Sequence, residues 1–147
     1  MNLFQRAIGL LWPHSTGGGY VRQIEPNSCG VACLAMVLEV DYWEARARVP
    51  SDDPEVGLLM GDILRVLGEN GWAVQEKWPH YSPAGTGRPW WPLRPWAPLH
   101  LCAVHSDGWH CVVMLPDGTV LDPLTPRPRR LTHYHEVYEM VGLWRVQ

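Results

Sequence analysis

The sequence predicts a single α+β domain, with helices in the first half of the chain and an antiparallel sheet in the second. Up to about residue 71, apolar residues recur at the three- and four-residue spacing of helices. Beyond it, short apolar runs are separated by turns that contain Asp-Gly, which is the signal of β-hairpins. The length of 147 residues suits one globular domain. Helices followed by a run of strands are typical of α+β folds.

Three helices are predicted before residue 71. The first covers 30–40, where one helical face carries four apolar residues, Val31, Leu34, Ala35 and Leu38. The second begins after Asp41, which with Glu44 resembles a capping box, and Pro50 ends it. The third covers 58–70, and Gly71 terminates it. We treat residues 1–19 as an N-terminal extension of the same domain, which spans 1–147.

Strands are predicted after these helices, at 72–75, 99–104, 109–115, 119–121 and 143–146. The segment 77–98 between the first two holds six of the 14 prolines and four of the nine tryptophans. Prolines at that density favour a loop, and the aromatic residues argue against disorder. We expect this loop, through Trp90 and Trp91, to form a wall of a substrate site or a partner surface. Packing into the core is the alternative.

Composition and charge exclude several classes of protein. The net charge of −3 argues against a nucleic-acid binder, which needs a basic surface. The one basic cluster, at Arg127, Arg129 and Arg130, is expected to lie in a solvated loop. No apolar run is long enough for a membrane span. Gln5 and Arg6 interrupt the apolar N-terminus, so we expect no secretion signal and a cytoplasmic location.

Cys29 is the strongest candidate for chemistry among the four cysteines. It follows a Pro-Asn-Ser turn at the point where the first helix should begin. Unpaired amides and the partial positive charge of a helix N-terminus stabilise a thiolate, the nucleophilic form of cysteine. Gly30 would let a substrate carbonyl approach the backbone closely. A buried structural role for Cys29 is the alternative, and Cys33 is expected in the core.

A thiol nucleophile needs a base and a group that orients the base. His110 begins a predicted strand, and Asp122 ends the next one. If 116–118 form a three-residue loop, Val112 faces Asp122, and His110 and Asp122 share one face of the sheet. A two-residue loop would turn the carboxylate to the other face.

Metal binding is the weaker interpretation of the cysteines and histidines in this region. Cys102, His105, His110 and Cys111 are the possible zinc ligands. Neighbouring strand residues point to opposite faces, which separates His110 from Cys111. We expect no metal and no cofactor.

Two segments carry a resemblance to a known family. Residues 23–38 read QIEPNSCGVACLAMVL, with a Gln six residues before a Cys-Gly pair and then an apolar helix; residues 109–114 read WHCVVM and residues 120–123 read VLDP. In this order and separation they resemble the bacteriocin-processing, double-glycine cysteine peptidases, which are papain-like. The resemblance covers about residues 20–125. It implies a papain-like fold in which the helix with the nucleophile packs on the C-terminal antiparallel sheet.

The resemblance also implies roles for four residues. Cys29 would be the nucleophile, His110 the base, Asp122 the residue that orients it, and Gln23 an oxyanion donor. The implied substrate is a peptide or protein, and Trp109 joins Trp90 and Trp91 as a candidate for contact with it. No P-loop pattern and no membrane segment accompany the motifs, so we expect a standalone domain, for which double-glycine cleavage is an analogy. The alternatives are an amidase or transglutaminase-like acyl-transfer enzyme, and a non-catalytic binding module.

Overall fold

The computed structural model describes residues 19–49, 58–78 and 99–146. Helices α2 (Cys29–Leu38), α3 (Tyr42–Arg48) and α4 (Met60–Glu69) come first, as the sequence predicts. Strands β1 (Trp72–Trp78), β2 (Leu99–His105), β3 (Trp109–Met114), β4 (Val120–Asp122), β5 (Thr125–Arg129) and β6 (Val137–Arg145) follow, with a short 3-10 turn, η1 (Leu131–His133), before β6. Most of the predicted N-terminal extension and Pro/Trp-rich loop, including Trp90 and Trp91, lies outside the described residues.

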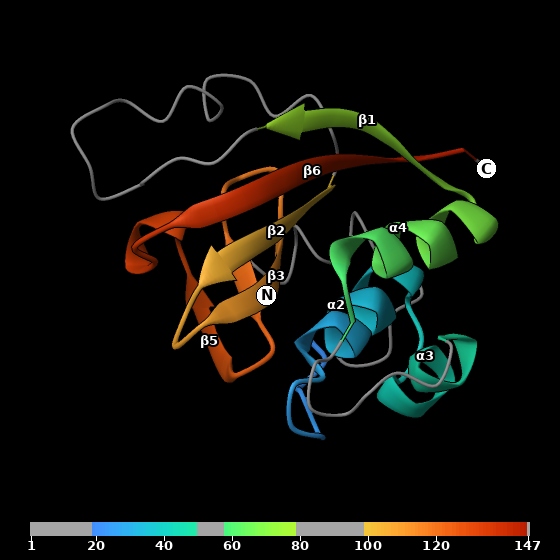
Figure 1. Ribbon diagram of the computed structural model, residues 1–147, viewed down its shortest axis with the longest axis horizontal. Coiled ribbons are helices and arrows are strands. Elements are labelled where there is room, and N and C mark those ends of the chain that lie inside the picture. The colour runs from blue at the N-terminus through green and yellow to red at the C-terminus, as the bar shows by residue number, and fades with distance from the viewer. Residues whose placement is uncertain (1–18, 50–57, 79–98, 147) are drawn as a thin grey trace, which may run out of the picture.

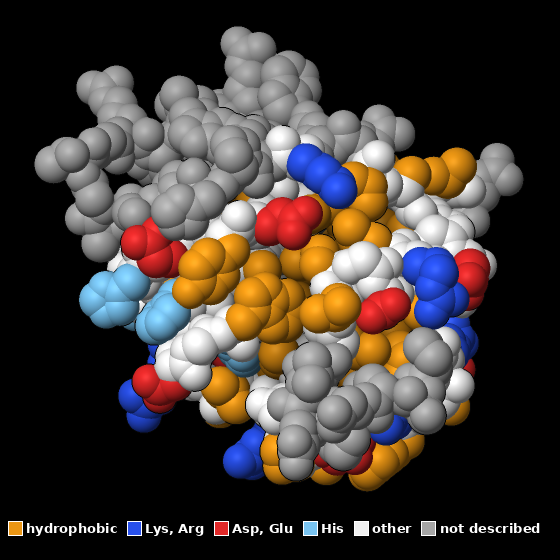
Figure 2. All heavy atoms as spheres, viewed as in Figure 1, with side chains coloured by type: hydrophobic (Ala, Val, Ile, Leu, Met, Phe, Trp, Pro, Cys, Tyr) orange, Lys and Arg blue, Asp and Glu red, His pale blue; other side chains and the backbone are white. Residues whose placement is uncertain are grey.

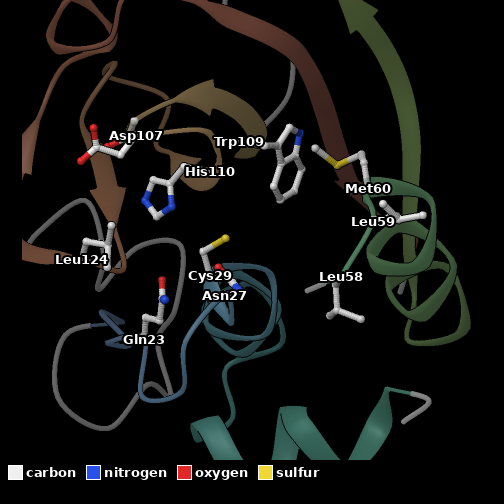
Figure 3. A pocket seen from close by; sticks show the side chains of 11 residues that line it. Gln23, Asn27, Cys29, Leu58, Leu59, Met60, Asp107, Trp109, His110 and Leu124 are labelled. Carbon is white, nitrogen blue, oxygen red and sulfur yellow. The ribbon is translucent and has the colours of Figure 1, made fainter. Parts of the chain in front are cut away.

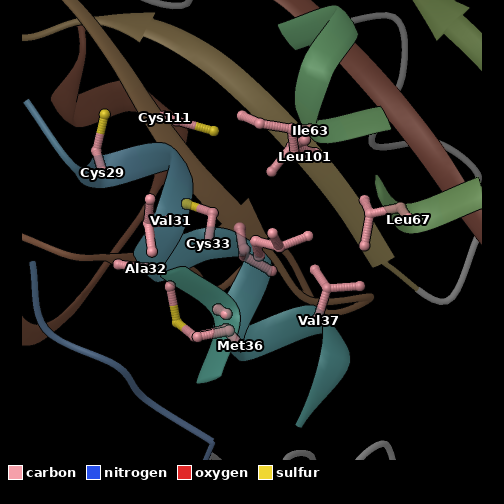
Figure 4. Close-up of a cluster of buried hydrophobic side chains, with 14 of the residues drawn as sticks. Cys29, Val31, Ala32, Cys33, Met36, Val37, Ile63, Leu67, Leu101 and Cys111 are labelled. Atoms are coloured by element: carbon pink, nitrogen blue, oxygen red, sulfur yellow. The ribbon is translucent and has the colours of Figure 1, made fainter. Parts of the chain in front are cut away.

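The strands form one antiparallel sheet in the order β1-β6-β2-β3-β4-β5, and the helices lie on one side of it (Figure 1). The predicted arrangement of helices packed on an antiparallel sheet is therefore confirmed. One hydrophobic cluster fills the space between the helices and the sheet (Figure 4). A second cluster, which includes Val112, Met114 and Tyr134, covers the other face. No helix within the described ranges is both long and apolar enough to cross a bilayer.

Helix α2 is buried on all sides, which differs from the single apolar face that the sequence pattern predicted. Nine of its ten residues are buried, whereas the predicted inward residue Leu38 is partly exposed. The reason is tertiary: β3, α3 and α4 all pack against this one helix. Helix α3 begins after Asp41, as predicted: Asp41 is its N-cap, and the Asp41 carboxylate accepts the Glu44 N–H at 2.8 Å.

Two parts of the sheet differ from the prediction. The basic segment expected as a loop is the edge strand β5, with Arg127 exposed. Prolines are tolerated there because an edge strand leaves half of its N–H groups unpaired. Strand β6 begins at Val137 rather than at residue 143, and it is central, paired with both β1 and β2.

Candidate functional site

Cys29 is the first residue of α2, and 5% of its surface is exposed. Ser28 occupies the N-cap position, but its hydroxyl does not cap the helix. Instead it donates to the Glu25 carbonyl at 2.5 Å and accepts the Glu25 N–H at 3.1 Å. The N–H groups of the first turn of α2 are therefore left without a side-chain cap, and they are donors available beside the Cys29 sulfur.

His110 and Asp122 meet at the ends of neighbouring strands. Val113 pairs with Leu121, and the Leu115 N–H donates to the Thr119 carbonyl at 2.8 Å. This register contains the three-residue loop 116–118, so the longer of the two predicted loops is the one formed. His110 Nε2 lies 2.7 Å from Asp122 Oδ1, and both side chains are buried.

The Asp122 carboxylate receives two further hydrogen bonds. The Leu124 N–H donates to Oδ1 at 2.8 Å, and the Tyr134 hydroxyl donates to Oδ2 at 2.5 Å. Burial alone would raise the pKa of Asp122, but the bonds from His110, Tyr134 and Leu124 outweigh it and lower the pKa. Asp122 is therefore an ionised carboxylate at neutral pH. Tyr134 was not predicted, because a tyrosine among histidines of common spacing carries no distinctive sequence signal.

His110 has a strongly shifted pKa because of its two partners. Burial lowers the pKa, but hydrogen bonds and charge interactions with Asp122 and Cys29 outweigh it and raise the pKa to about 9. The ring is therefore mostly imidazolium at neutral pH. Nε2 faces Asp122, which leaves Nδ1 as the nitrogen for Cys29.

A backbone hydrogen bond holds Gln23 against the end of β4, where Asp122 lies. Its N–H donates to the Pro123 carbonyl at 2.9 Å, next to Asp122. Its side-chain Nε2 donates to the Glu25 carbonyl at 3.2 Å, and the amide carries a second hydrogen. Oε1 is buried and finds no hydrogen-bond partner among the described residues. The side chain points toward the Cys29 region (Figure 3).

A pocket of about 610 Å³ surrounds these groups. His110 and Gln23 lie on one side of Cys29, and Trp109, Met60 and Leu58 lie on the other (Figure 3). Hydrophobic side chains gather on the visible surface where β2 and β3 approach α4 (Figure 2). The pocket has one apolar wall that the sequence did not indicate, formed by Leu58, Leu59 and Met60 with the predicted Trp109, which is 44% exposed; Leu124 lies across the pocket, on the side of His110 (Figure 3).

Gly30 has a packing role that the sequence did not reveal. A Cβ atom built on it would lie 2.9 Å from Ile63 Cδ1 and 3.1 Å from Leu58 Cβ. Its small size therefore lets α2 approach α4, and it is not one of the residues lining the pocket. A contact between Gly30 and substrate remains an untested prediction.

The other cysteines belong to the interior. Cys33, Cys102 and Cys111 are free and buried, and Cys33 and Cys111 lie between α2 and the sheet (Figure 4). Burial raises the pKa of Cys33 and the pKa of Cys102, which favours their neutral thiols. Among the described residues, no group of three or more His, Cys, Asp or Glu side chains is arranged to hold a metal ion.

Comparison with known proteins adds a structural likeness. No protein-family model matches the sequence, and no curated protein matches it. Among solved structures, the fold is similar to the crystal structure of a double-glycine motif protease from an AMS/PCAT transporter in complex with the leader peptide. The TM-score is 0.58 and the identity 18%, over 86% of this chain and 90% of that one. The likeness shows that the two chains share a fold.

Proposed function

We propose that this protein is a cysteine peptidase that uses Cys29, His110 and Asp122 as a catalytic triad. The observation that carries the proposal is the position of His110, which is hydrogen-bonded to Asp122 at 2.7 Å and lines one pocket together with Cys29. A nucleophile, a base and an orienting carboxylate in this order are the parts that covalent acyl transfer requires. The shared fold with a double-glycine protease supports the same reading.

The proposed reaction begins from a thiolate at Cys29 and an imidazolium at His110. The sulfur attacks the peptide carbonyl carbon, and the carbonyl oxygen becomes an oxyanion. The free hydrogen of the Gln23 amide and the Cys29 N–H are the proposed donors to that oxyanion. His110 gives its proton to the leaving amine as the carbon–nitrogen bond breaks, which leaves a thioester on Cys29. His110 then takes a proton from water, whose attack on the thioester releases the acid and the thiolate.

The proposed substrate is a peptide segment that lies across the apolar wall of the pocket. The structural neighbour is a protease in complex with a leader peptide. Here Trp109 and Leu124, both exposed, offer apolar contacts on either side of the catalytic groups. Cleavage after a double glycine is part of the proposal, as are a papain-like fold and a cytoplasmic location.

Two other functions use the same pocket differently. An amidase or a transglutaminase-like enzyme would keep the triad and take another acyl substrate, and a binding module would keep only the pocket. Cys29 and His110 in one pocket, with Asp122 bonded to His110, favour catalysis, because a binder has no chemical need for all three.

Alkylation with iodoacetamide, followed by peptide mapping, tests whether Cys29 is activated. We expect selective modification of Cys29 near neutral pH, because Cys29 lines the pocket whereas the three other cysteines are fully buried away from it. His110→Ala should remove the excess rate. A wild-type Cys29 that reacts no faster than a free thiol would contradict the proposed function.

A further inference from the structure

Tyr134 approaches the triad from the side of the sheet opposite the helices. It follows the η1 turn, where its N–H donates to the Leu131 carbonyl at 3.0 Å. Its ring is 2% exposed and packs in the second hydrophobic cluster with Val112 and Met114. Its hydroxyl donates to Asp122 Oδ2 at 2.5 Å. A turn that is buried at Leu131 and at Tyr134 thus holds one hydroxyl against the carboxylate that bonds to His110.

We propose that Tyr134 is a positioning residue of the triad, which fixes the Asp122 carboxylate so that Oδ1 faces His110. The inference rests on the proposed function for its catalytic meaning. It is argued from the fact that the two oxygens of the Asp122 carboxylate bind different partners.

The need for such a residue follows from the freedom of an aspartate side chain. The terminal torsion of Asp is broad, so burial by itself does not select which oxygen faces His110. The Leu124 N–H and His110 both bond to Oδ1. Tyr134 bonds to Oδ2, and this second point of attachment fixes the plane of the carboxylate. A buried oxygen that lost this donor would be left without a bond, which favours rotation or protonation.

The charged and titratable groups around Asp122 come from several elements. Those with a direct influence on Asp122 or on the Tyr134 hydroxyl are His110, Tyr20, Cys33 and Arg129. The Tyr20 hydroxyl donates to the main-chain carbonyl of Asp122 at 2.9 Å and leaves the carboxylate oxygens to the other donors. Tyr134 is thus distinguished from Tyr20 by the atom that it binds.

Tyr134→Phe removes this hydroxyl and keeps the ring. We expect the pKa of Asp122, followed by carboxyl ¹³C NMR, to rise, because the bond from Tyr134 lowers it. We expect the iodoacetamide alkylation of Cys29 at pH 7 to slow by about five-fold, the factor for one net hydrogen bond. Tyr42→Phe is the matched control: Tyr42 is 3% exposed, and its hydroxyl donates to the Glu25 carboxylate at 2.8 Å. It should leave the Asp122 titration unchanged.

A second measurement uses the wild-type protein, so it does not depend on whether Tyr134→Phe folds. In the wild type, the ¹³Cζ resonance of Tyr134 should titrate at the same pH as the Asp122 carboxyl, because one hydrogen bond joins them. A Tyr134 resonance that does not change with pH would overturn the inference. So would a Tyr134→Phe variant in which Cys29 is alkylated at the wild-type rate and the pKa of Asp122 is unchanged. If wild-type Cys29 instead reacts like a free thiol while the Tyr134 resonance follows Asp122, the proposed function fails and the positioning of Asp122 stands.

Discussion

His110 is the residue on which the site depends, because its two ring nitrogens serve two different partners. Nε2 is hydrogen-bonded to Asp122, and Nδ1 is the nitrogen that is left for Cys29. A folded-state pKa of about 9 lies above the ordinary histidine value near 6.5. The interaction of protonated His110 with its partners therefore stabilises the fold fully below about pH 6.5. This stabilisation is lost as the pH rises through about 9.

The titration of His110 follows from these contacts. In the wild type, NMR of the imidazole carbons should give a midpoint near pH 9. In Asp122→Asn the midpoint should fall, because the bond and the negative charge that raise the pKa are gone while burial, which lowers it, remains. A midpoint that is unchanged in Asp122→Asn would contradict the assignment of Asp122 as the orienting group.

The role of Gln23 can be separated from that of His110 by using two reagents on one variant. Acylation of Cys29 by p-nitrophenyl acetate passes through an oxyanion, whereas alkylation by iodoacetamide does not. We expect Gln23→Ala to slow acylation by about 100-fold, the loss typical of one oxyanion donor, and to leave alkylation unchanged. An equal loss in both reactions would mean that Gln23 supports the structure of the Cys29 turn instead.

Helix α2 is the element that joins the core to the site. It is buried on all sides, and Gly30 in its first turn contacts α4 so closely that a Cβ atom would lie 2.9 Å from Ile63 Cδ1. Gly30 directly follows Cys29, and because it has no side chain the two helices can approach each other at this point. The position of Cys29 therefore depends on close packing between α2 and α4.

Substitution of Gly30 tests this packing. Gly30→Ala should destabilise the protein by about 1–3 kcal/mol, as overpacking does, despite the better helix propensity of alanine. Gly61→Ala and Gly68→Ala are matched controls in α4, where a Cβ atom meets nothing within 4 Å. They should stabilise it by about 0.5–1 kcal/mol. Urea unfolding measures all three, and a Gly30→Ala variant as stable as the controls would contradict the packing argument.

Short sequence motifs predicted the turns and helix caps, because the conformation there is set by the residues of the motif itself. The turn at Asp107-Gly108 forms with positive φ angles of 53° and 109°, and Asp41 caps α3. The register that unites His110 and Asp122 also followed from loop length and strand alternation. What sequence reasoning missed depends on neighbours distant in the chain. Strand β6 is central because β1 and β2 flank it, and Tyr134 reaches Asp122 through a turn whose spacing is common.

At the scale of the whole molecule, the site lies where the helical part of the chain meets the sheet. Gln23 and Cys29 come from the beginning of the described chain, and His110 and Asp122 come from the ends of β3 and β4. The N–H of Gln23 and the hydroxyl of Tyr20 tie the first segment to the end of β4. The sheet, with a hydrophobic cluster on each face, therefore fixes the positions of His110 and Asp122, and these bonds tie the segment that carries Gln23 to it.

Cleavage of a proteome-derived peptide library tests the central claim most directly. The wild-type protein and Cys29→Ala are each incubated with the library, and new peptide termini are identified by mass spectrometry. We predict that the wild type generates a set of new termini with a common sequence pattern, and that Cys29→Ala generates none of them. If the wild type produces no new termini while Cys29 is selectively alkylated, the protein is not a peptidase of general peptide substrates and the account is contradicted.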